Sequence, residues 1–127
     1  MQKNARLEVM SELEPGVEKT IKNFLISPDE IWQPADLLPD SQSNNFLEEV
    51  KEIRELSKEL DDDFWVALVG DTITEEALPT YESWLLGVEG MDVTNGGNNW
   101  AKWIKQWTGE EKRHGDILNK MLYLSGR

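Results

Sequence analysis

The sequence predicts an all-α fold, a helical bundle, and two observations support this prediction. Hydrophobic residues recur at steps of three and four through most of the chain, which is the spacing of one face of an α-helix. Residues that favour turns gather in a few short stretches between these periodic segments. With 127 residues, 39% of them hydrophobic, the chain is long enough to form one domain with a core.

The N-terminal part of the chain is predicted to form a helix followed by a loop. Residues 5–26 keep hydrophobic residues at helical steps. Pro15 lies inside this segment, and because proline removes a backbone hydrogen bond and clashes with the preceding turn, we expect a kink or two short helices. Residues 27–45 are rich in Pro, Asp, Ser and Asn, so we expect an ordered loop anchored by Trp32 and by Leu37 and Leu38.

A second helix is predicted from Ser43, a candidate N-cap, to about Leu60. A third helix begins at Asp61–Asp63, because negative charge is stabilised at the positive end of the helix dipole. The apolar run over residues 64–69 is also compatible with a buried strand. Turn-forming residues are sparse from there to residue 86, which favours one long buried helix.

The last helix is predicted to follow a flexible connection over residues 87–99, with Asn98 or Asn99 as its cap. Its residues at steps of one, three or four form a single stripe. The members of this stripe are Trp100, Trp103, Ile104, Trp107, Glu111, His114, Leu118, Met121 and Leu122. We expect the stripe to face the protein interior.

Glu111 and His114 have the spacing of a metal-binding pair. Residues i and i+3 project from one face of a helix, so a carboxylate and an imidazole at these positions can reach one cation. A buried carboxylate costs several kcal/mol unless it is paired, neutralised or bound to a metal. The alternatives are a buried Glu–His hydrogen bond and an exposed pair where the stripe bends.

A second acidic pair, Glu75 and Glu76, lies inside the third helix. Because the surrounding residues are largely apolar, we expect at least one of the two to face inward. The apolar run before them gives no clear helical phase, so the spacing does not decide between them.

Composition excludes several classes of protein. The chain has no cysteine, so neither disulfides nor thiolate metal sites are expected. No apolar run is long enough for a membrane span, and no targeting segment is visible at the N-terminus. The net charge is −12, which disfavours nucleic acid as a partner. Residues 98–127 nevertheless hold six of the 13 basic residues, and the last helix could present a basic surface to an acidic protein or simply carry solvated charge.

Four predicted helices, two of them with inward carboxylates, fit the ferritin-like di-metal carboxylate proteins. Several longer motifs then match one family in order and spacing. They are Trp32-Gln33-Pro34, Asp71–Tyr81 with its Thr74-Glu75-Glu76-Ala77-Leu78-Pro79 centre, Trp107-Thr108, Glu110–Gly115, Leu118–Lys120 and Tyr123–Arg127. In these motifs the chain resembles the plant acyl-[acyl-carrier-protein] desaturases along nearly its whole length.

The resemblance implies a soluble enzyme of fatty acid biosynthesis in the plastid or chloroplast stroma, with a ferritin-like core and a di-iron centre. It implies that a saturated acyl chain on acyl carrier protein receives a cis double bond, with O₂ as oxidant and electrons from ferredoxin, in a homodimer. By their positions in the motifs, Glu75, Glu111 and His114 are implied as Fe(2+) ligands. No catalytic residue beyond these ligands is implied.

The chain departs from the family in length, because family members take a second lone Glu and a second Glu-x-x-His from later helices. We therefore expect residues 1–127 to be the N-terminal part of a ferritin-like di-iron desaturase domain, an incomplete bundle with half the ligands. Alone, such a chain is expected to be inactive. The alternative is a non-catalytic helical module that binds acyl carrier protein or desaturase subunits.

The family also implies an acyl channel along the helix that follows the lone Glu. Its candidate lining residues in this chain are Tyr81, Trp84, Leu85, Gly87 and Val88, and Trp84 is bulky enough to alter the fit of the acyl chain. Ordinary core packing is the alternative for each of them.

Overall fold

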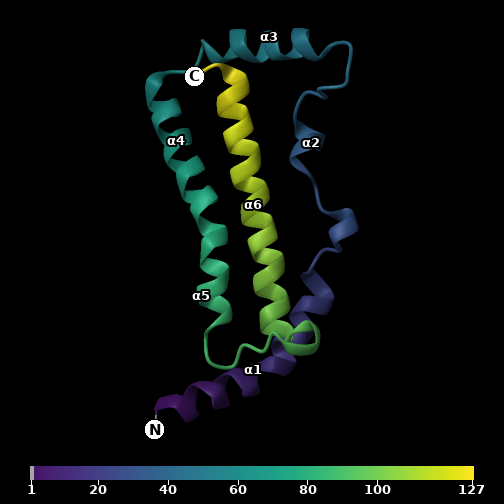
Figure 1. The fold of residues 1–127 in the computed structure, drawn as a ribbon, viewed down its shortest axis with the longest axis vertical. Helices are drawn as coiled ribbons and strands as arrows, with labels where there is room; N and C mark the ends of the chain where they lie inside the picture. Colours follow the sequence, from purple (N-terminus) through teal and green to yellow (C-terminus); the bar gives the residue numbers. More distant parts are fainter. Residues whose placement is uncertain (1) are drawn as a thin grey trace. The chain divides into compact units, whose positions relative to one another are not determined.

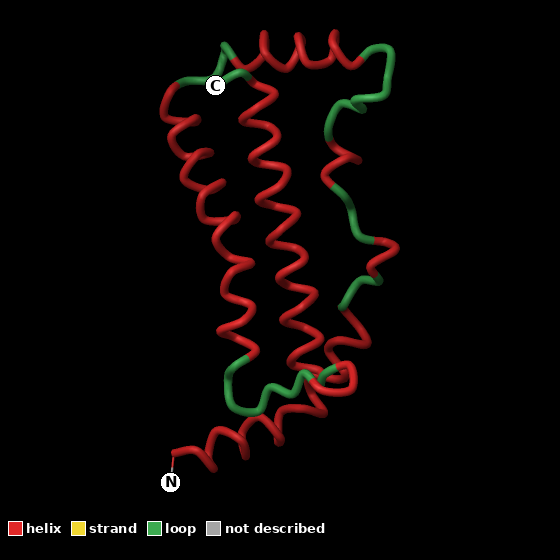
Figure 2. The backbone as a smooth tube through the Cα atoms, viewed as in Figure 1, coloured by secondary structure: helices red, strands yellow, loops and turns green. Residues whose placement is uncertain are grey.

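The computed structural model describes residues 2–127, and this part of the chain is all-α, as predicted (Figure 1). Figure 2 shows helices joined by loops, with no strand over the described residues. The α-helices are α1 (Gln2–Phe24), α2 (Pro34–Leu37), α3 (Phe46–Ser57), α4 (Asp62–Ala77), α5 (Glu82–Leu86) and α6 (Asn99–Ser125). Short 3₁₀ helices cover Pro28–Glu30, Leu78–Tyr81 and Thr94–Gly96. The four predicted helices correspond to α1, α3, α4 and α6.

The chain divides into two compact units, and α6 contributes to both. The first unit holds the residues up to Ile31 together with Pro79–Glu110. The second holds Trp32–Leu78 together with Glu111–Arg127. No helix in the described range is both long and apolar enough to cross a membrane.

Helix α1 runs through Pro15 without a break, so the predicted alternative of two short helices is wrong. Proline removes only one backbone hydrogen bond, and a long helix can retain the others. The helical turn after Pro15 has an additional side-chain hydrogen bond, in which the Thr20 hydroxyl donates to the Gly16 carbonyl at 2.9 Å.

The predicted loop over residues 27–45 is partly helical, which corrects the expectation. Pro28 begins a 3₁₀ helix and Pro34 begins α2, at positions where a missing N–H costs no hydrogen bond. The Asp36 carboxylate accepts from the Gln33 N–H at 2.7 Å and so supports the start of α2.

Helix α3 is shorter than predicted and begins later. Its N-cap is Asn45 rather than Ser43, and it ends at Ser57 rather than near Leu60. The Ser43 hydroxyl instead accepts from the Asn45 N–H at 3.1 Å, so it stabilises the turn before the helix.

Helix α4 begins as predicted, with the Asp61 carboxylate accepting from the Phe64 N–H at 2.9 Å. The predicted single helix to residue 86 is wrong, because α4 ends at Ala77 and a 3₁₀ turn precedes α5. Pro79 accounts for the interruption, since it lacks an N–H and clashes with the preceding turn. Nor is α4 buried all round, because Val66 is 72% exposed.

In the first unit, α1 contacts the beginning of α6. The Glu14 carboxylate accepts from both the backbone and side-chain N–H groups of Asn99, at 3.0 and 2.9 Å. The Trp100 indole N–H donates to the Met10 carbonyl at 3.3 Å. Asn98 caps α6 as predicted, because its side-chain oxygen accepts from the Ala101 N–H at 3.1 Å.

The predicted stripe on α6 is only partly correct. Ile104 is buried, but Trp103 is 45% exposed and stacks on Trp107 with ring centroids 6.3 Å apart. The most buried positions of this part of α6 include Ala101 and Thr108, which are off the stripe. Small side chains let a helix approach its neighbours closely, so size as well as hydrophobicity decides which face is buried.

Replacing the N-cap of α4 tests how this helix begins. Asp61→Ala removes the acceptor for the Phe64 N–H and should lower the free energy of unfolding by about 1 kcal/mol. Asp61→Asn keeps an acceptor and should retain most of this stability. Urea denaturation followed by circular dichroism compares the two, and equal losses would contradict the cap.

Candidate metal centre

In the second unit, α4 and α6 lie side by side (Figure 1). They approach closely at Gly115, which is buried. A Cβ atom at this position would lie 3.2 Å from the backbone nitrogen of Glu76 and 3.3 Å from the carbonyl carbon of Glu75. One turn further along α6, the Asn119 amide donates to the Glu76 carboxylate at 2.6 Å. These contacts bring the middle of α4 against the Glu-x-x-His of α6.

Glu75, Glu111 and His114 converge at this contact, each offering a ligand atom within 4.8 Å of the others. The His114 Nδ1 atom lies 3.2 Å from a Glu111 carboxylate oxygen and 3.4 Å from a Glu75 carboxylate oxygen. The structure thus selects Glu75 of the acidic pair to face inward, while Glu76 is exposed and bonds Asn119.

The electrostatics of the cluster are unfavourable for two ionised carboxylates. Burial raises the pKa of Glu75 above its usual range, and the neighbouring Glu111 carboxylate raises it further. His114 opposes this rise, because it favours the ionised form of Glu75. The site therefore favours a proton or a cation between the carboxylates.

Trp32 covers the cluster from the segment before α2. Its indole ring stacks on the His114 imidazole with centroids 6.0 Å apart and planes 16° from parallel. The Arg113 guanidinium lies over the same indole, 5.7 Å from the ring centroid. The aromatic ring thus restricts the orientation of the imidazole.

The three residues fit a divalent transition metal. Ligand atoms that each lie about 2 Å from one ion are roughly 3 Å apart, which matches the two measured separations within a few tenths of an ångström. Two carboxylates and one imidazole are suitable donors for iron. A buried oxygen of Glu75 also makes no hydrogen bond, which a bound cation would remedy.

The sequence prediction missed three residues that build this site. Gly115, like Trp32 and Asn119, enters the sequence analysis only through a motif, although a glycine that directly follows a candidate ligand inside a predicted helix is a signal for close helix approach. Asn119 and Trp32 gave no spacing signal, because both act across elements that are distant in sequence.

The five channel candidates lie in or after the 3₁₀ turn and α5 of the first unit. Trp84 is 72% exposed and Tyr81 50% exposed, so core packing does not account for them in this structure. A groove of about 400 Å³ in the same unit is lined by other residues, among them Leu13, Val17, Trp100 and Trp103. The channel assignment stays a prediction.

Comparison with known proteins gives consistent results. The family model described as fatty acid desaturase matches residues 5–127. The chain is 49% identical over 124 residues to a protein of Arabidopsis thaliana named stearoyl-[acyl-carrier-protein] 9-desaturase 5, chloroplastic. Proteins named stearoyl-[acyl-carrier-protein] 9-desaturase, chloroplastic, from Elaeis guineensis var. tenera and Ricinus communis are 51% and 48% identical.

These alignments cover 96% of this chain but only 31–32% of the three relatives. The chain therefore spans about a third of the length of the curated relatives it matches. The resemblance inferred from the motifs is confirmed over that part.

The raised pKa of Glu75 predicts a pH dependence of stability in the metal-free protein. Because the folded state binds this proton more tightly, stability falls as pH rises from the unfolded pKa through the folded pKa. Glu75→Gln removes this titrating group. The change that it causes in the free energy of unfolding should therefore be more stabilising at pH 7 than near pH 4, which is about the pKa of Glu in the unfolded chain.

Urea denaturation with a chelator present measures both variants, with exposed Glu76→Gln as the control. Parallel stability curves for wild type and Glu75→Gln across this range would refute the pKa shift.

Proposed function

The chain belongs to the fatty acid desaturase family, and from this membership we propose that it forms part of an acyl-carrier-protein desaturase of the plastid. In this proposal it supplies one half of a di-iron site that inserts a cis double bond into a saturated acyl chain. The reaction uses O₂ and electrons from ferredoxin. The observation that carries the proposal is the convergence of Glu75, Glu111 and His114.

The number of metal ligands in the chain is the reason for calling this site one half of a di-metal centre. A ferritin-like di-metal centre takes a lone Glu and a Glu-x-x-His from each of two helix pairs. This chain has one histidine, so α4 and α6 provide one such set. We propose that the second set comes from outside these residues, supplied by further polypeptide or by another subunit of the family's homodimer.

Each residue of the half-site has a separable task. Glu75 binds a cation in its ionised form, so affinity should rise with pH as this carboxyl loses its proton. Glu111, with an oxygen 3.2 Å from the His114 Nδ1 atom, supplies a second carboxylate for the same ion. Trp32 shields one face of that ring from water. Bound iron supplies the O₂ chemistry needed to remove hydrogen from an unactivated methylene, which no amino-acid side chain provides.

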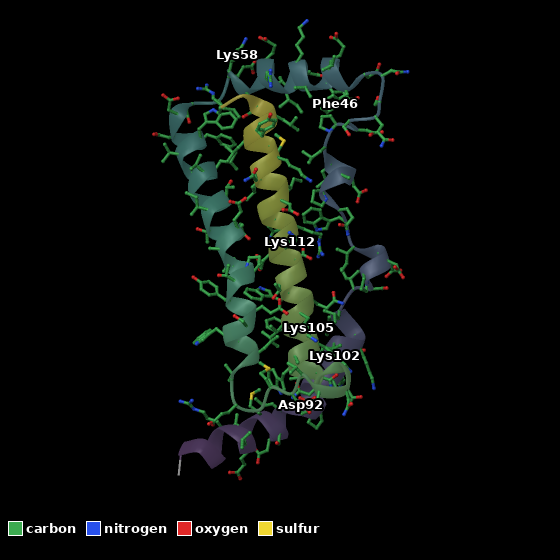
Figure 3. All side chains as sticks on the ribbon, in the orientation of Figure 1. Phe46, Lys58, Asp92, Lys102, Lys105 and Lys112 are labelled. Carbon is green, nitrogen blue, oxygen red and sulfur yellow. The ribbon has the colours of Figure 1, made fainter. Side chains whose placement is uncertain are left out.

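The proposed substrate fits the charge of α6. The names of the relatives specify an acyl group on a carrier protein, and we propose the same substrate class here. Lys102, Lys105 and Lys112 project from α6 and are exposed (Figure 3). Exposed lysines attract an acidic partner and speed its association.

A second candidate function is a non-catalytic module that binds acyl carrier protein or desaturase subunits. Residues 1–127 hold one histidine and therefore one Glu-x-x-His, and by themselves they do not complete a di-metal site. The two functions differ in whether the chain binds iron at all.

Anaerobic Fe(II) titration tests the half-site. The chain should bind about one metal ion per protomer, and His114→Ala should abolish this binding because it removes the only imidazole. Glu76→Gln is the matched control, since Glu76 neighbours Glu75 but lies outside the cluster. Binding that survives His114→Ala, or no binding by wild type, would overturn the half-site, and the latter favours the non-catalytic module.

Charge reversal tests the carrier-protein surface. Lys102→Glu combined with Lys105→Glu should slow association with acyl carrier protein by about tenfold, and wild-type binding should weaken as salt rises. Lys58→Glu, just after the end of α3, reverses an exposed charge elsewhere and should change little. Surface plasmon resonance measures the rates, and unchanged association would remove these lysines from the interface.

A further inference from the structure

We propose that Gly115 is a positioning residue for the metal centre, because its missing side chain lets α4 approach α6 closely enough for Glu75 to meet Glu111 and His114. The inference rests on the proposed function, since it concerns the same candidate site. It assigns a role to a residue that is not itself a ligand.

The close approach, and not backbone conformation, is what requires glycine here. The four glycines with positive φ are Gly90, Gly96, Gly97 and Gly126, and Gly115 is not among them. It lies inside α6 and is buried. An added Cβ would meet the Glu76 nitrogen at 3.2 Å and the Glu75 carbonyl carbon at 3.3 Å, and backbone atoms cannot rotate away as a side chain can.

The location of this contact couples it to all three candidate ligands. Gly115 follows His114 directly and comes one helical turn after Glu111. The backbone that it touches on α4 belongs to Glu75 and Glu76. A methyl group here would therefore push the two halves of the cluster apart at their junction.

The Asn119–Glu76 hydrogen bond restrains the same pair of helices in a second way. At 2.6 Å it joins α6 to α4 one turn beyond Gly115. Gly115 thus sets the separation of the two helices, while Asn119 sets how they slide along each other. Metal ligands must be held within about 0.5 Å of the productive geometry, and the few tenths of an ångström that an added Cβ demands take up much of this tolerance.

The experiment compares Gly115→Ala with Gly70→Ala. Gly70 is a helical glycine of α4 whose added Cβ would meet nothing within 4 Å. Both substitutions raise helix propensity equally, so they differ in the interhelical contact. Anaerobic Co(II) titration should show affinity weakened about tenfold or more by Gly115→Ala and unchanged by Gly70→Ala, with helicity retained in both.

A metal-free measurement separates this inference from the proposed function. The chain has one histidine, so its imidazole NMR signals need no assignment among several. Glu75→Gln should shift these signals in wild type, because Glu75 lies 3.4 Å from His114 Nδ1. In the Gly115→Ala background the same substitution should shift them much less.

The Co(II) titration and the NMR comparison give different results if the half-site is wrong and if the role of Gly115 is wrong. If wild type binds no Co(II), the proposed half-site fails, and the NMR comparison alone decides the role of Gly115. If Gly115→Ala leaves either Co(II) affinity or the Glu75–His114 coupling at the wild-type level, the positioning role is wrong. If Gly115→Ala does not fold in dilute buffer, the same NMR comparison is made with a stabilising osmolyte present, and an undiminished Glu75–His114 coupling would overturn the inference.

Discussion

The burial of two neighbouring carboxylates beside one imidazole is the constraint on which the contact between α4 and α6 depends. Glu75 and Glu111 both approach His114, at 3.4 and 3.2 Å, and burial makes their joint ionisation costly. A protein without use for such a cluster gains stability by separating these groups or making one of them apolar. Here the surrounding contacts hold them together instead.

Those contacts come from different levels of structure. The glycine of α6 allows the approach of the two helices, the Asn119 amide holds their register, and the Trp32 ring stacks on the imidazole. None of these interactions neutralises charge. They hold the three candidate ligands in position, and the negative charge of the two carboxylates is balanced by a proton or a metal ion. A metal centre requires this arrangement.

The sequence predicted the interactions between residues close together in the chain, and it did not predict those between distant elements. Local rules located the caps at Asp61 and Asn98, and helical spacing located the Glu111–His114 pair. Local rules failed at Pro15 and Pro79, where the same residue type allowed one helix to continue and ended another. The choice between Glu75 and Glu76 needed the phase of α4 relative to α6, which no spacing within α4 contains.

The stripe on α6 shows a second kind of failure. Counting hydrophobic residues placed Trp103 inside, whereas it is half-exposed, and the buried positions of α6 include the small residues Ala101, Thr108 and Gly115 beside Ile104. Large aromatic rings can be partly covered by each other, as Trp103 and Trp107 are, without lying in a core. Small residues at steps of seven were the better indicator of the face that other helices touch.

The participation of α6 in both units has a consequence for biosynthesis. The first unit needs Asn99 to meet Glu14, 85 residues earlier, and the second needs the Leu124 carbonyl to meet Arg54, 70 residues earlier. Contacts this distant in sequence form slowly, because the intervening chain must be closed first. Neither unit can therefore be completed on the ribosome until α6 has emerged, and until then the faces of α1 and α4 that α6 contacts stay uncovered and open to chaperones.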